Sequence, residues 1–266
     1  MSRRDIRNRH FYHLVDASPW PIVNSACALS LVASAIVWFN QKMGACLLFS
    51  VFSLIFCSIL WFKDVVREGT FEGHHTLKVQ TSLRFGMILF IISEVMFFFS
   101  FFWTFFHSSL SPDIQIGCVW PPVELTCLKT FRVPALNTAI LLTSGAAVTW
   151  AHYGLIKNDR EQVTLAFSFT LFLAVLFTAF QVMEYLSSKY YMTDGIYGSI
   201  FFMITGFQGF HVIIGSIFLA VCFFRFLSYH FTPKHHLGFQ AAAWYWHFVD
   251  VVWILLFFCV YMWGNS

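Results

Sequence analysis

Seven long apolar runs constrain the fold more than any other feature of the sequence. A helix needs about 20 apolar residues to cross the hydrocarbon core of a bilayer, and each run has roughly that length. The runs are continuously apolar, whereas the strands of a membrane barrel alternate with a period of two in segments of about ten residues. We therefore predict seven transmembrane helices. They cover approximately residues 22–39, 44–62, 85–106, 135–153, 163–183, 197–224 and 239–262.

The composition excludes a soluble domain. Hydrophobic residues make up 58% of the chain and charged residues only 11%, whereas charged residues make up roughly a quarter of soluble domains. A folded soluble chain keeps much of its surface in water, so 35 Phe and 10 Trp side chains would not fit into one water-facing core. We expect an all-α membrane protein, with residues 1–266 forming a single integral membrane domain.

The charged residues lie mainly at the ends of the predicted spans. The net charge is +3, far below the clustered basic excess that neutralises phosphates in nucleic-acid-binding proteins, so we expect no nucleic-acid partner. Basic residues mark the inner side of a membrane protein, which predicts an inner N-terminus and an outer C-terminus. Twelve lie on one side, at Arg3, Arg4, Arg7, Arg9, Lys63, Arg67, Lys78, Arg84, Lys157, Arg160, Arg225 and Lys234, and four on the other, at Lys42, Lys129, Arg132 and Lys189.

The seven cysteines form no recognisable metal or redox motif. The sequence contains no CxxC, and only Cys118 and Cys127 share a loop, which leaves a disulfide between them as a minor alternative. The other five lie inside apolar runs, where a free cysteine packs as a small hydrophobic residue. We expect no metal site in this chain. The five are Cys27, Cys46, Cys57, Cys222 and Cys259.

One carboxylate lies in the middle of the third predicted span. The helical neighbours of Glu94 are Phe90, Ile91, Phe97 and Phe98, and none of their side chains offers a hydrogen bond. An ionised carboxylate loses its hydration there unless another helix supplies a donor. Glu94 is therefore either an acid that handles a proton and reacts with carbodiimides, or a protonated packing residue.

Two histidines lie within the last two spans. His247 and Asp250 are three residues apart, which lets the imidazole and the carboxylate meet on one helical face. We interpret them as a structural pair, with a proton relay as the alternative. His211 and His247 lie on consecutive antiparallel spans, so a second alternative is a self-contained membrane cytochrome in which they ligate one haem.

A group of polar residues is expected at the inner membrane interface. Arg67, Glu68, His75 and Arg225 lie near Trp61 at the inner ends of their spans. Such a mixture suits an anionic phosphate with acyl chains beneath it. The alternative is that the basic side chains only snorkel toward water.

The sixth span carries a stripe of small residues. In lipid, helices associate through close packing of small side chains, so the stripe predicts the close approach of another helix. It consists of Gly198, Thr205, Gly209, Ser216 and Ala220.

Eight motifs spread over the whole chain carry a further signal. They are SPWP at 18–21, REGTFEGHHT at 67–76, RFGMILFIISEV at 84–95, WPP at 120–122, TWAH at 149–152, DGIYGS at 194–199, GFHVIIG at 209–215 and AAAWYWHFVDVVW at 241–253. With these motifs, the chain resembles subunit III of the mitochondrial, aa3-type cytochrome c oxidase from end to end.

This resemblance implies a fold and a set of site residues. The fold is a V-shaped bundle, in which a first pair of helices and the following five enclose a cleft for phospholipids. Glu94 matches the buried, carbodiimide-reactive carboxylate of the family. No haem or copper lies in such a subunit, and haem a, haem a3 and copper are expected in subunits I and II. The residues matching positions that line the lipid cleft are Trp61, Arg67, Glu68, Thr70, His75, Arg225 and His230.

The resemblance also implies a function, partners and a location. The chain would be a core subunit, without a catalytic residue of its own, of an oxidoreductase and translocase that passes electrons from cytochrome c to oxygen and pumps protons. Its roles would be to stabilise the catalytic subunits, bind structural phospholipids, support proton uptake and guide oxygen. Its partners would be subunits I and II, accessory subunits and a respiratory supercomplex. Its location would be the mitochondrial inner membrane, with the N-terminus in the matrix and the C-terminus in the intermembrane space.

The chain departs from the family pattern at two places. Gln208 stands where the family commonly has a histidine, which weakens any argument for a metal or proton role at that position. Residues 124–132 do not follow the usual loop, which leaves contacts with partner subunits in this region undefined.

Overall fold

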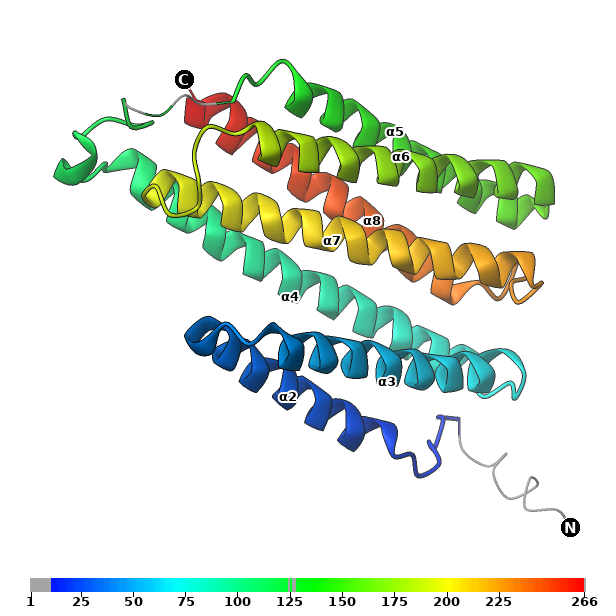
Figure 1. The fold of residues 1–266 in the computed structure, drawn as a ribbon. Helices are drawn as coiled ribbons and strands as arrows, with labels where there is room; N and C mark the ends of the chain where they lie inside the picture. Colours follow the sequence, from blue (N-terminus) through cyan, green and yellow to red (C-terminus); the bar gives the residue numbers. More distant parts are fainter. Residues whose placement is uncertain (1–10, 124, 126–127, 266) are drawn as a thin grey trace, which may run out of the picture. The chain divides into compact units, whose positions relative to one another are not determined.

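The computed structural model describes residues 11–123, 125 and 128–265, and the described residues contain helices and loops but no strand. Seven helices are long and apolar enough to cross a membrane, the last of them running from Leu237 to Met262 (Figure 1). The predicted membrane helices are therefore confirmed. The helices are α2 (Trp20–Gln41), α3 (Gly44–Thr70), α4 (Leu77–Leu110), α5 (Val133–Lys157), α6 (Arg160–Ser187), α7 (Ile196–Leu227) and α8 (Leu237–Leu256), with the short segments η1 (Ile114–Ile116), η2 (Phe257–Met262) and η3 (Trp263–Asn265).

The first six membrane helices extend beyond the apolar runs that predicted them, and α8 begins two residues before its run. α4 has 34 residues, which corresponds to about 50 Å of helix against a hydrocarbon core of about 30 Å. Its first turns contain Lys78 and Gln80, and a count of apolar residues excludes both. The Gln80 side chain stabilises this end of the helix, because its Nε2 donates to the His75 carbonyl at 3.0 Å. Hydrophobicity defines the buried part of a span, and hydrogen bonding at the membrane surface defines its ends.

The chain divides into two compact units, residues 1–83 and 84–266. The first unit contains α2 and α3, and the second contains most of α4 and the four later helices. This agrees with the expected first pair and following five. The boundary falls inside α4, and both the V shape and the single membrane domain stay predictions.

In the first unit, hydrogen bonds connect α2 to α3. Trp20 Nε1 donates to Asp64 Oδ2 at 2.5 Å, and Ser58 Oγ donates to Asn24 Oδ1 at 3.0 Å. Polar side chains facing each other across two helices stabilise such pairs in lipid, where burial of apolar surface gives little driving force between helices. A third contact, at 3.1 Å, joins the hydroxyls of Ser30 and Ser50.

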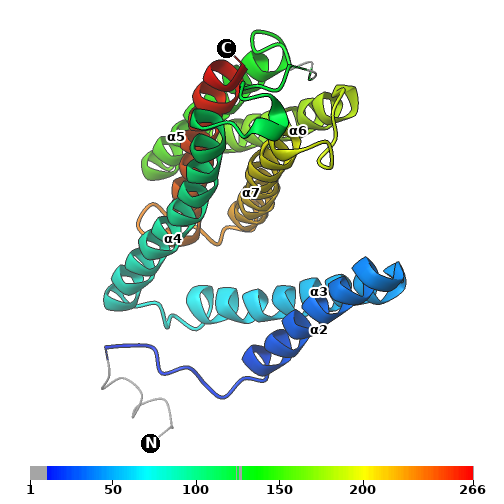
Figure 2. The same cartoon turned by 90° about the vertical axis from the view of Figure 1, so that its left-hand side faces the viewer.

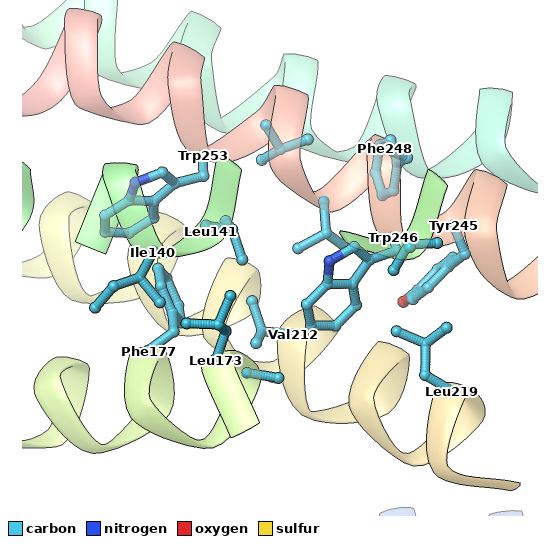
Figure 3. Packing of buried hydrophobic residues seen from close by; sticks show 14 of the residues in the cluster. Ile140, Leu141, Leu173, Phe177, Val212, Leu219, Tyr245, Trp246, Phe248 and Trp253 are labelled. Atoms are coloured by element: carbon cyan, nitrogen blue, oxygen red, sulfur yellow. The ribbon is translucent and has the colours of Figure 1, made fainter. Parts of the chain in front are cut away.

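In the second unit, the core forms around α8, which packs against α5 and α7. Figure 2 shows α5 and α7 of this unit from a second direction. Trp246 and Trp253 on α8 are completely buried, and their indole N–H groups donate to Ser144 Oγ at 2.9 Å and to Thr138 Oγ1 at 3.0 Å. Figure 3 shows both rings among apolar side chains. The two largest core side chains therefore pack with their polar atoms satisfied.

The predicted stripe of small residues on α7 is only partly correct. Gly198 and Thr205 are buried, but no atom of the described chain lies within 4 Å of a Cβ built at Gly209. The closest approach to α8 occurs instead at Gly215, where a Cβ would lie 3.0 Å from the Trp246 ring. The stripe was placed by spacing alone, which does not determine how a helix is rotated toward its neighbours.

Candidate functional site

The buried carboxylate predicted in the third span has a partner on another helix. Glu94 Oε2 on α4 lies 2.8 Å from His211 Nε2 on α7. The other ring nitrogen, His211 Nδ1, lies 2.6 Å from the Phe207 carbonyl oxygen one turn earlier. His211 is buried and Glu94 is partly exposed. The donor that an apolar surrounding requires for a carboxylate is thus supplied by α7.

This geometry assigns one of the two protons of the pair. A carbonyl oxygen only accepts hydrogen bonds, so His211 Nδ1 carries a proton and donates it to Phe207. One further proton lies between His211 Nε2 and Glu94 Oε2, and it belongs either to the imidazole or to the carboxyl group. The pair is therefore neutral in total with the proton on either side, which makes it compatible with an apolar site.

Aromatic side chains surround the pair. The His211 ring packs edge-on against Phe98, with centroids 5.0 Å apart, and stacks with Tyr245 at 6.2 Å. Phe97 lies 6.3 Å from the same ring. This environment excludes water from most of the imidazole, so the hydrogen bond to Glu94 is its main polar contact outside its own helix.

The second predicted pair is also in contact. His247 Nδ1 lies 3.5 Å from Asp250 Oδ2, and His247 Nε2 lies 3.2 Å from Thr149 Oγ1 on α5. Gly145 makes room for the carboxylate, since a Cβ there would lie 2.2 Å from Asp250 Oδ2. The contact supports a pair that joins α8 to α5, and its structural role stays a prediction.

The arrangement gives no support to haem ligation by His211 and His247. All four ring nitrogens of the two histidines already contact protein atoms. Over residues 11–123, 125 and 128–265, no group of three or more His, Cys, Asp or Glu side chains is placed to hold a metal ion. The loop pair of Cys118 and Cys127 falls partly outside the described residues, because Cys127 is not among them.

In the first unit, ionic side chains gather where α3 ends. Arg67 Nε lies 3.1 Å from Glu72 Oε1, and His74 Nε2 lies 3.3 Å from Glu72 Oε2. His13 Nδ1 approaches Glu68 Oε2 at 3.9 Å. The Arg67 side chain keeps 71% of its surface exposed, so its guanidinium is accessible to an anion while it contacts Glu72.

The remaining predicted lipid-binding residues fall into two groups. Trp61 and Thr70 lie on α3, and His75 lies in the following loop, where a Cβ at Gly69 would come within 2.6 Å of its ring. Arg225 and His230 belong to the second unit. The Arg225 guanidinium lies 4.6 Å from the centre of the Phe231 ring, and the His230 backbone N–H donates to the Arg225 carbonyl at 3.0 Å.

Sequence reasoning missed two polar residues and one contact that the structure makes prominent. His13 stacks on His74 with centroids 4.6 Å apart, but it lies in a polar segment before the first apolar run. Glu184 is 2% exposed, yet the predicted fifth span ended one residue before it. The partnership of His211 with Glu94 was also missed, because the two residues are 117 positions apart.

Comparisons with known proteins connect these observations to a family. A family model described as Cytochrome c oxidase subunit III matches residues 10–265. The chain is 53% identical over 260 residues to cytochrome c oxidase subunit 3 of Prototheca wickerhamii, covering 97% of this chain and 99% of that protein. It is 51% identical over 256 residues to the Petromyzon marinus subunit 3 and 52% to that of Danio rerio, in both cases covering 96% of this chain and 98% of the relative. The chain belongs to the cytochrome c oxidase subunit III family.

Proposed function

We propose that this chain stabilises the catalytic subunits of cytochrome c oxidase, binds structural phospholipids and supports proton uptake, without holding a redox centre itself. The observation that carries the proposal is the family match over residues 10–265. The proposed partners are subunits I and II, accessory subunits, and a respiratory supercomplex. Haem a, haem a3 and copper in the partner subunits would supply the electron transfer from cytochrome c to oxygen.

The proposed location is the mitochondrial inner membrane, with the N-terminus in the matrix and the C-terminus in the intermembrane space. The distribution of basic residues supports this orientation, because inner loops carry the excess of Lys and Arg. Among the described residues, the basic group includes Lys63, Arg67, Lys157, Arg160 and Arg225. The predicted contributions of Arg3, Arg4, Arg7 and Arg9 lie outside the described residues.

The proposed proton role rests on Glu94 and His211. A hydrogen bond of 2.8 Å between a carboxyl oxygen and an imidazole nitrogen allows one proton to lie on either group. Moving the proton between the two members leaves the total charge of the pair unchanged, so the transfer creates no net charge in the apolar surroundings. We propose that Glu94 acts as the protonatable, carbodiimide-reactive member of this pair.

Glu94→Gln is expected to assemble at wild-type levels, because the glutamine amide N–H donates to His211 Nε2 while His211 Nδ1 keeps its hydrogen bond to the Phe207 carbonyl. A hydrophobic carbodiimide should label the wild-type chain at residue 94 and should no longer label the variant there. Assembly is measured as the amount of tagged chain recovered per haem a, and labelling by mass spectrometry. Failure of the variant to assemble would show that the carboxylate itself is required for packing.

The proposed lipid site is supported by the exposed Arg67 guanidinium at the end of α3. Arg67→Gln removes one positive charge near the membrane surface, and we expect it to weaken phospholipid retention by about 1 kcal/mol, or roughly five-fold. Phospholipids retained per complex are counted by native mass spectrometry. The matched control is Lys42→Gln, which removes a charge at the opposite end of the hairpin. Equal lipid loss in both variants would contradict a specific site at Arg67.

A further inference from the structure

Another buried carboxyl group lies where α5 begins, α6 ends and the chain approaches its C-terminus (Figure 1). Glu184 on α6 accepts a hydrogen bond from the Tyr261 hydroxyl, with an O–O distance of 2.8 Å. Tyr261 is completely buried and Glu184 is 2% exposed. A charged or polar group placed so deeply is stable only if its hydrogen-bonding atoms find partners.

A π-helical segment brings Tyr261 to this position. The chain changes from α-helix to π-helix at Phe257–Met262, and such changes occur frequently at functional sites. Thr130 Oγ1 donates to the Tyr261 carbonyl at 2.6 Å, which satisfies a backbone acceptor in this irregular turn. Tyr261 is thus bound at both ends, because its backbone carbonyl accepts a hydrogen bond from Thr130 and its hydroxyl donates to Glu184.

Two buried amides lie beside the carboxyl group. Gln181 is one helical turn before Glu184 on α6, and Asn137 faces it from α5. Asn137 Nδ2 donates to Gln181 Oε1 at 3.4 Å. The exposed fractions of Asn137 and Gln181 are 0% and 6%. The Gln181 side chain also lies near the hydroxyls of Tyr185 and Tyr261, but its Nε2 atom makes no hydrogen bond of normal distance and angle to either hydroxyl.

These contacts leave three buried polar atoms without a hydrogen-bond partner in the described protein: Asn137 Oδ1, Gln181 Nε2 and Glu184 Oε2. Rotating both amide groups by 180° exchanges their donor and acceptor atoms, but one amide donor, one amide acceptor and Glu184 Oε2 still stay unmatched. The deficit therefore does not depend on how the amides are assigned. Two of the three atoms are acceptors and one is a donor.

A water molecule has the complementary set of groups. One water placed between the three side chains would accept a hydrogen bond from Gln181 Nε2 and donate to Glu184 Oε2 and Asn137 Oδ1. Buried waters in proteins typically make about three hydrogen bonds to groups that are otherwise unsatisfied. A metal ion fits less well, because the Gln181 N–H group is a donor and would be directed at a cation. We propose that Asn137, Gln181 and Glu184 form an internal water-binding site that hydrates the Glu184 carboxyl group.

The direct test is a cryo-electron microscopy map of the intact wild-type oxidase at a resolution that shows ordered waters. We expect a density peak within hydrogen-bonding distance of Asn137 Oδ1, Gln181 Nε2 and Glu184 Oε2. The proposal is overturned if no peak is present or if the three side chains contact one another directly.

A matched pair of variants extends the test. Gln181→Leu removes the donor to the water, and we expect the peak to disappear. Gln208→Leu is the control, because Gln208 is a buried glutamine on α7, and the peak near Glu184 should remain. Hydroxyl-radical labelling in ¹⁸O water gives an independent readout, since a bound water is a local source of radicals. Tyr261 should take up label in the wild type and lose at least half of it in Gln181→Leu. Undiminished labelling in that variant contradicts the site, and the wild-type map decides the question if the variant does not assemble.

Discussion

Trp246→Ala is expected to destabilise the second unit by about 3 kcal/mol and to lower the amount of chain recovered with the oxidase. Trp246 is completely buried on α8, packs against Gly215 on α7, and donates to Ser144 on α5. Removing the indole leaves a cavity between three helices and a hydroxyl without its donor. In lipid, these lost contacts are the main source of helix association.

The matched control is Trp103→Ala, which makes the same chemical change on a side chain that is 67% exposed. The measurement is the temperature at which half of the tagged chain separates from the purified oxidase. We expect the midpoint to fall clearly for Trp246→Ala and to change little for Trp103→Ala. A similar fall of the midpoint temperature in both variants would indicate that Trp103 contacts another oxidase subunit. It would contradict the expectation that Trp246 contributes more to stability than Trp103.

Gly198→Ala is expected to cost about 1–3 kcal/mol through overpacking. A Cβ at this position would lie 2.2 Å from the Tyr191 carbonyl oxygen, which is a backbone atom and is not displaced by a side-chain rotation. The turn is held by hydrogen bonds from Tyr191 N to Asp194 Oδ2 at 2.8 Å and from Ser199 Oγ to the Met192 carbonyl at 2.7 Å. The first turn of α7 would have to move for the methyl group to fit.

Gly209→Ala on the same helix is the control for this change. No described atom lies within 4 Å of the added methyl group, and alanine is a better helix former than glycine by about 1 kcal/mol. Gly209→Ala should therefore assemble as well as the wild type, while Gly198→Ala should be recovered in lower yield with the same midpoint assay. The reverse order would show that α7 packs through Gly209 against a partner subunit.

The membrane helices could be predicted from the sequence because their signal is local. Each span needs only a run of apolar residues, and all seven runs became helices. The helix ends could not be predicted in this way. The missed residue Glu184 illustrates the limit, because its charge ended the predicted run although the helix continues to Ser187. A count of apolar residues does not identify the hydrogen-bond partner that lets a carboxylate be buried.

The contacts of the candidate site depended on tertiary structure. Glu94 was identified from its apolar neighbours. The need for a donor from another helix followed because a carboxylate loses its hydration in such surroundings. Which helix supplies it could not be deduced, because Glu94 and His211 are paired through the rotation of α4 and α7. By contrast, His247 and Asp250 are one helical turn apart, so their contact was predictable from spacing alone.

We propose that the haem of the oxidase lies in the partners of this subunit. The most direct test is a reduced-minus-oxidised optical spectrum of material purified through a C-terminal tag, recorded before and after a detergent removes the partner subunits. We predict haem absorbance in the intact preparation and its loss from the tagged chain together with the partners. Haem absorbance that stays with the isolated chain would contradict the account and would make His211 and His247 the leading ligands.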